Sequence, residues 1–99
     1  MYKFVRSAKV KANFPAALKW AKEVTEYINN KHSPPKVSVY SGMFGDVNTI
    51  FWEAEHKDLA SLEAVFAKLT ADPGYWALVE KAAGMFIEGS VYDSIRGIA

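Results

Sequence analysis

The stretch VSVYSGMFGDVNTIFWEAEH, residues 37–56, constrains the fold most, because it combines a turn with apolar side chains of both parities. A half-buried strand alternates apolar and polar residues, since successive side chains point to opposite faces. Here Ile50 and Trp52 share one parity while Phe51 takes the other. Both faces of this predicted hairpin therefore need cover. The first arm repeats the pattern, with Val37 and Val39 set against Tyr40 and Phe44.

Four further segments carry a periodic pattern. Alternation predicts strands at residues 2–12 and 86–98, and apolar spacing of three and four predicts helices at residues 13–30 and 56–86. The resulting order is strand, helix, strand, strand, helix, strand. This is the ferredoxin-like βαββαβ order of the α+β class, in one domain spanning residues 1–99. Right-handed crossovers predict a four-stranded antiparallel sheet, in the order 4-1-3-2, with both helical regions on one face.

Capping residues refine the helical regions. Asn13 precedes a proline-containing first turn, and Asp58 stands where the second region begins. Asp72 followed by Pro73 repeats this signal inside the second region, which predicts a break there into two helices.

Composition extends the argument about the uncovered face and excludes several classes of protein. The chain is 51% hydrophobic and 14% aromatic, which is rich for 99 residues, so we expect a homodimer that buries the bare sheet face. The net charge of +1 does not indicate a nucleic-acid partner. No run approaches the roughly 18 apolar residues of a membrane span. With no cysteine to form disulfides or thiolate sites, we expect a soluble, cytoplasmic protein.

The order of elements, together with FWEAEHKDLASLEAVFAKL and DPGYWALVEKAAGMF, resembles the dimeric α+β barrel superfamily. The resemblance covers almost the whole chain and includes NIPSNAP-like and antibiotic-biosynthesis-monooxygenase-like domains. It implies a homodimer in which two sheets pack face to face. Members of that superfamily include cofactor-free oxygenases, haem-degrading enzymes, isomerases and proteins of unassigned activity. The resemblance therefore predicts the fold and leaves the activity open.

Two histidines and a pair of glutamates raise the question of a metal or acid–base site. Strand geometry places Glu53 and Glu55 on one face and His56 on the other, so the three should not converge. We expect an exposed His56, a solvated His32, and pairing of the two glutamates with basic residues of the first strand, namely Arg6, Lys9 or Lys11. No metal, haem or other cofactor is expected.

Arg6 interrupts an apolar parity, so its charge should be paired or should face a cavity. A salt bridge to a carboxylate such as Asp93 is the first interpretation, and an anchor for an anionic or carbonyl-bearing ligand is the second. Aromatic side chains with a polar edge suit a pocket for a planar apolar molecule, with Trp20 and Met43 as further contributors. The candidate ligand-binding residues are Arg6, Tyr40, Trp52, Trp76 and Tyr92.

Two functions remain open, and the sequence assigns no catalytic residue. The first is a small homodimeric protein of unassigned activity that binds a small planar organic ligand between sheet and helices. The alternative is a cofactor-free monooxygenase-like enzyme acting on a small aromatic or polyketide-like substrate. A wet, polar pocket would favour the enzyme, and a space filled by apolar side chains would favour the first function.

Overall fold

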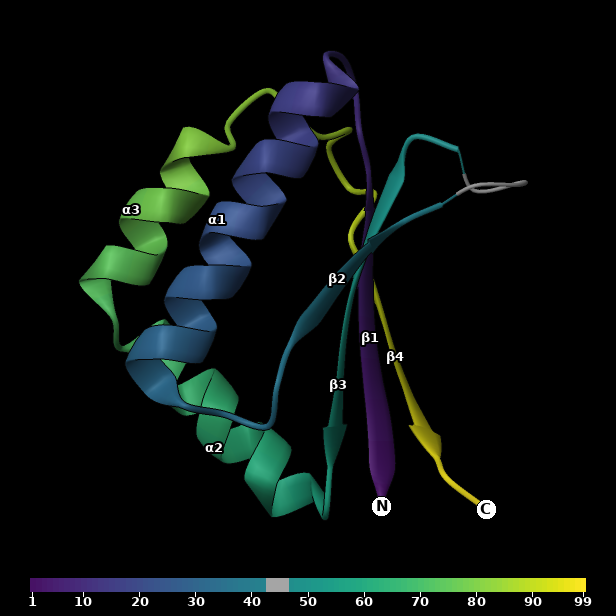
Figure 1. The fold of residues 1–99 in the computed structure, drawn as a ribbon, viewed down its shortest axis with the longest axis vertical. Coiled ribbons are helices and arrows are strands. Elements are labelled where there is room, and N and C mark those ends of the chain that lie inside the picture. Colours follow the sequence, from purple (N-terminus) through teal and green to yellow (C-terminus); the bar gives the residue numbers. More distant parts are fainter. Residues whose placement is uncertain (43–46) are drawn as a thin grey trace.

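A computed structural model describes residues 1–42 and 47–99, so Met43 and Phe44 lie outside the described residues. Four strands form one antiparallel sheet in the order β2-β3-β1-β4, and the helices all lie on one side of it (Figure 1). This confirms the predicted ferredoxin-like architecture and strand order. The elements are β1 (Tyr2–Lys9), α1 (Phe14–His32), β2 (Ser38–Ser41), β3 (Thr49–His56), α2 (Leu59–Thr70), α3 (Pro73–Lys81) and β4 (Tyr92–Gly97).

All three predicted helix caps are confirmed, because each side chain accepts a hydrogen bond from a first-turn backbone N–H. The break before Pro73 is confirmed as well, since α2 ends at Thr70 and α3 starts anew. The pairs are Asn13 with the N–H of Ala16, Asp58 with that of Ser61, and Asp72 with that of Gly74.

The first and last strands are shorter than their alternating patterns predict. β1 ends at Lys9, and β4 covers only residues 92–97 of the predicted 86–98. An isolated antiparallel bridge joins Val10 to Phe86 outside the two strands. The missing part of the last strand is instead a turn that leads from α3 back to the sheet.

The register of β1 and β3 decides which parity faces the helices. Arg6 lies opposite Trp52, and Ala8 lies opposite Ile50. Cross-strand partners share a face of the sheet. Ile50 is fully buried against α1, so Arg6 and Trp52 lie on the same, helix-facing side. The core residues of α1 that cover this side are Ala17, Ala21, Val24 and Ile28.

The other parity forms a surface that no helix covers, which we call the open face. Its centre is apolar, with Val5 and Phe51, and Tyr92 at its edge is 68% exposed. The open face includes Lys3, Val5, Ser7, Tyr40, Phe51, Glu53 and Tyr92. Separately, none of the helices in residues 1–42 and 47–99 is long and apolar enough to cross a membrane.

One ion pair on the open face corrects the sequence analysis. Glu53 accepts from the ammonium group of Lys3 at 2.8 Å, whereas Arg6, Lys9 or Lys11 was expected as its partner. That expectation was wrong for Arg6 because Arg6 lies on the opposite side of the sheet. Lys3 lies one diagonal step away on the same face, within reach of Glu53.

Candidate functional site

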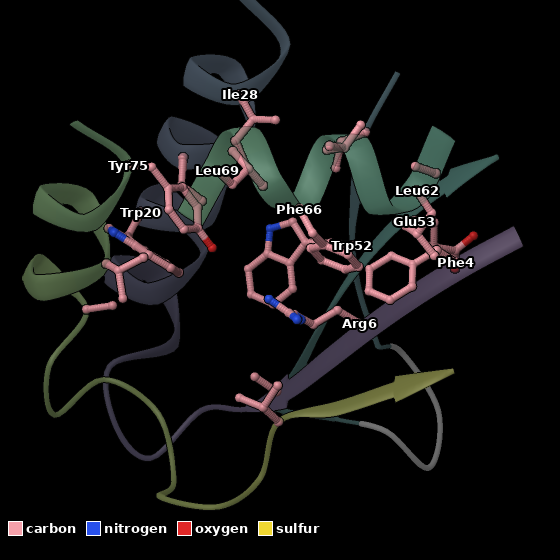
Figure 2. A pocket seen from close by; sticks show the side chains of 18 of the residues that line it. Phe4, Arg6, Trp20, Ile28, Trp52, Glu53, Leu62, Phe66, Leu69 and Tyr75 are labelled. Atoms are coloured by element: carbon pink, nitrogen blue, oxygen red, sulfur yellow. The ribbon is translucent and has the colours of Figure 1, made fainter. Parts of the chain in front are cut away.

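A cavity of about 350 Å³ lies between the helix-facing side of the sheet and the three helices (Figure 2). Its size is at the lower end of the range found for small-molecule sites, about 300–1,000 Å³. Two exposed residues, Ala83 and Val91, are among its lining, so the cavity reaches the surface near them. The apolar wall includes Phe4, Trp20, Val24, Ile28, Leu62, Val65, Phe66, Leu69, Val79 and Phe86.

Arg6 is the only charged side chain that Figure 2 shows extending from the sheet towards the middle of this apolar space. Its Nε and Nη2 donate to the two carboxylate oxygens of Asp93 at 2.7 and 2.8 Å. The predicted salt bridge is thereby confirmed. The guanidinium also lies 5.9 Å from the ring centre of Phe4 and 5.7 Å from that of Phe66. The hydrogen bonds to Asp93 raise the pKa of Arg6 despite its partial burial, so it stays charged.

Two further hydrogen-bond donors belong to the cavity wall. Trp52 Nε1 is buried and has no hydrogen-bond partner among the described residues. Buried N–H groups are almost always paired, so an unpaired one in a cavity wall is unusual. Tyr75, in the first turn of α3, directs its hydroxyl into the same space (Figure 2) and makes a smaller contribution to the raised pKa of Arg6.

His56 lines the cavity as well, and its surroundings correct the expectation that it is exposed. The residue is only 3% exposed, because α2 begins three positions later and folds back over it. Its Nδ1 lies 3.1 Å from the hydroxyl of Ser61. Burial lowers the pKa of His56 below its ordinary value, an effect that Asp58 partly opposes, so the imidazole is neutral at pH 7.

The structure places the five candidate residues in three different locations. Arg6 and Trp52 face each other across β1 and β3 and both line the cavity. Tyr40 and Tyr92 lie on the open face, one sheet thickness away. Trp76 is 47% exposed on α3, where its Nε1 donates to the carbonyl oxygen of Thr70.

Sequence reasoning did not select several residues that line the cavity, among them Tyr75, His56 and Phe66. Tyr75 could have been found from the helix break, because it lies three positions after the cap Asp72 and belongs to the apolar stripe of α3. The signal for His56 was also present: it has the parity of Trp52 and therefore faces the helices.

A metal site is not formed among residues 1–42 and 47–99, since no three histidine, aspartate or glutamate side chains gather there. His32 is instead engaged with Asp72, whose carboxylate lies 2.7 Å from the imidazole Nε2. Asp72 also accepts from Tyr27, Lys31 and the N–H of Gly74. Burial alone would raise the pKa of Asp72, but these hydrogen bonds lower it well below its ordinary value.

Comparison with solved structures identifies the fold. A NIPSNAP family protein of unknown function from Agrobacterium tumefaciens is 22% identical, with a TM-score of 0.83 over 100% of this chain and 88% of that one. An uncharacterised NIPSNAP domain protein from Burkholderia xenovorans is 18% identical, with a TM-score of 0.82 over 100% and 95%. SnoaB, a cofactor-independent oxygenase from Streptomyces nogalater, is 10% identical, with a TM-score of 0.70 over 98% and 91%.

No protein-family model matches the sequence, and no curated protein matches it significantly. At these levels of identity, the likeness to solved structures concerns the fold alone. The resemblance seen in the sequence is thereby confirmed at that level: the chain has the ferredoxin-like α+β fold shared by NIPSNAP family proteins and antibiotic-biosynthesis-monooxygenase-like domains.

Proposed function

We propose that this protein binds a small planar organic ligand in the cavity between its sheet and its helices. The observation that carries the proposal is a largely apolar cavity whose lining includes Trp52, with a buried Nε1 that has no hydrogen-bond partner among the described residues. A donor in that position is stabilised when a bound molecule supplies an acceptor, because leaving it unpaired costs about 1–3 kcal/mol. Ligand sites typically combine such an apolar wall with a few fixed polar groups.

The shape of the wall supports a flat ligand. Trp20 and Trp52 meet edge to face with their ring centres 6.2 Å apart, and Phe86 lies 5.5 Å from Trp20 in a similar arrangement. At the other side of Arg6, Phe4 and Phe66 form a second edge-to-face pair at 5.2 Å. Aromatic faces and edges of this kind suit an aromatic or otherwise conjugated molecule.

The proposal includes a homodimer formed through the open face, in the cytoplasm. Apolar side chains at the centre of the open face, Val5 and Phe51, are flanked by the Lys3–Glu53 ion pair. An apolar centre with a charged rim is the usual composition of an interface between subunits. A two-fold pair would place the same patch on itself, with the cavities on the outer sides of the two sheets.

Binding of N-phenylnaphthylamine, a neutral aromatic amine whose fluorescence rises in apolar surroundings, tests the ligand proposal. Val79→Phe adds volume in the cavity wall, whereas Ala77→Phe makes an equivalent addition on an exposed position of the same helix. We expect saturable binding by the unmodified protein and by Ala77→Phe, and at least a tenfold weaker affinity for Val79→Phe. Equal affinities in folded samples of all three would place the probe elsewhere and contradict the proposal.

A second candidate function is a cofactor-free monooxygenase-like activity on a polyketide-like substrate. The fold it shares with SnoaB and the donors on Arg6, Trp52 and Tyr75 favour it, since such donors stabilise negative charge that develops on a substrate oxygen. Because the cavity wall is mostly apolar, we place this enzymatic activity second, after simple ligand binding. Oxygen uptake in the presence of a hydroxyanthrone, lost in Trp52→Phe, would support the enzyme, and no uptake by a protein that binds the compound would exclude it for that compound.

A further inference from the structure

We propose that Asp93 sets the charge preference of the cavity, so that the ligand is an uncharged molecule carrying a carbonyl-type acceptor oxygen and not an organic anion. This inference deepens the proposed function and rests on it. It makes a choice between the two ligand classes, anionic and carbonyl-bearing, that Arg6 alone leaves open.

The hydrogen-bonding groups in the cavity favour a ligand that carries an acceptor. Arginine has five N–H donors, and Asp93 takes two of those on Arg6, which leaves three. The N–H of Trp52 and the hydroxyl of Tyr75 add to these donors in the same space (Figure 2). Because the convergent groups are mainly donors, the complementary ligand is one that presents an acceptor oxygen to them.

The charges around Arg6 disfavour an anionic ligand. A bidentate carboxylate 2.7–2.8 Å from the guanidinium cancels most of the attraction that Arg6 would exert on an anion. A second carboxylate brought to Arg6 would approach Asp93 as well and would be repelled by it. His56 adds no positive charge at pH 7, because burial lowers its pKa. The negative charge of Glu53 is paired with Lys3 on the open face.

The position of the Arg6–Asp93 ion pair also disfavours an anionic ligand. The side chains of Arg6 and Asp93 are 35% and 41% exposed, so solvent reaches the ion pair. Asp93 lies on β4, close in sequence to Val91, which lines the cavity and is itself exposed. A ligand that contacts Arg6 therefore lies close to Asp93, whose carboxylate is 2.7 Å from the guanidinium. An anionic group at that position would be repelled by Asp93.

The test uses three naphthalenes substituted at the same ring position, each competing with N-phenylnaphthylamine. Acetylnaphthalene carries a neutral carbonyl, naphthoate a carboxylate, and ethylnaphthalene no acceptor. We expect the unmodified protein to bind acetylnaphthalene on the order of tenfold more tightly than naphthoate, and more tightly than ethylnaphthalene. Asp93→Asn removes the compensating charge with little change in shape, and should improve naphthoate binding on the order of tenfold while leaving ethylnaphthalene unchanged.

The matched control is Glu26→Gln, which removes one negative charge from an exposed position of α1. It should leave all three affinities unchanged, and circular dichroism should show that both variants are folded. Equal or tighter binding of naphthoate by the unmodified protein would overturn the inference even if Asp93→Asn did not fold. Improvement of naphthoate binding by both variants would overturn it too, since it would reflect net charge alone. If N-phenylnaphthylamine itself does not bind the unmodified protein, the proposed function has failed and not this inference alone.

Discussion

Replacing Trp20 with phenylalanine is the change for which the structure gives the most complete expectation. The indole Nε1 of Trp20, on α1, donates to the carbonyl oxygen of Leu78 on α3 at 2.7 Å. The last turn of α3 leaves this oxygen available, because the N–H of Ala82 bonds to Val79 instead. Carbonyl groups at the C-terminal end of a helix need such outside partners. The bond therefore both caps α3 and ties it to α1.

The magnitude has two parts. Phenylalanine cannot donate, so the partly buried carbonyl oxygen of Leu78 loses its partner, which costs about 1–3 kcal/mol. The smaller ring also loses part of its edge-to-face contacts with Trp52 and Phe86, each worth about 0.5–1.5 kcal/mol. We expect Trp20→Phe to lower the free energy of unfolding by about 2–4 kcal/mol.

Trp76→Phe is the matched control, because it removes the same kind of bond from the end of another helix. Trp76 Nε1 donates to the carbonyl oxygen of Thr70 at 2.9 Å, but the residue is 47% exposed, so water can replace the indole. The expected loss is below about 1 kcal/mol. Urea unfolding followed by circular dichroism measures both variants, with unchanged dependence on urea as the check on comparability. Losses that agree within about 0.5 kcal/mol would refute the reasoning, because burial would then not matter.

The open face, the burial of His56 and the contact of Gly74 with Tyr27 each give a testable expectation. Phe51→Glu should convert a sedimenting dimer to monomer at low micromolar concentration, because two-fold symmetry buries two new charges, whereas Ala77→Glu should not. The pKa of His56 is below 6.5 in the folded protein, so the stability that the neutral imidazole confers is present above pH 6.5 and lost as the pH falls through the folded value. The urea midpoint should therefore fall more steeply from pH 7.5 to pH 5 in the unmodified protein than in His56→Gln, and equal slopes would contradict this. Gly74→Ala should lower the melting temperature although alanine favours helices, because the added methyl group overlaps the Tyr27 hydroxyl. Most of that loss should vanish in Tyr27→Phe, and an undiminished loss would point to another cause.

The sequence predicted the order of elements well because that order depends on local chemistry. Asn13, Asp58 and Asp72 each cap a helix through a residue two or three positions ahead, a relation that is visible without any tertiary structure. The predicted salt bridge of Arg6 with Asp93 also followed from a simple rule, that a charge on an apolar parity needs a partner.

The candidate site was harder to predict, because a side chain of the sheet can line the cavity only if it points towards the helices. Tyr40 and Tyr92 have the same chemistry as the cavity aromatics, but their parity places them on the open face. The sequence could not decide which parity faces the helices, since both carry apolar residues in the hairpin. Burial of Ile50 against α1 settles the matter, and with it the position of Trp52 beside the cavity and of Phe51 on the open face.

This alternation also separates the two proposed functions of the sheet. Phe51 and Trp52 are neighbours in the chain, yet one would contact a partner subunit and the other a ligand. Arg6 and Val91 line the cavity, and Arg6 and its partner Asp93 lie on the helix-facing side, so a subunit docked on the open face would leave this part of the cavity uncovered. A monomeric, folded Phe51→Glu variant should therefore still bind N-phenylnaphthylamine with nearly the affinity of the unmodified protein. Loss of both properties together in a folded sample would mean that the second subunit holds the cavity in shape through the shared sheet.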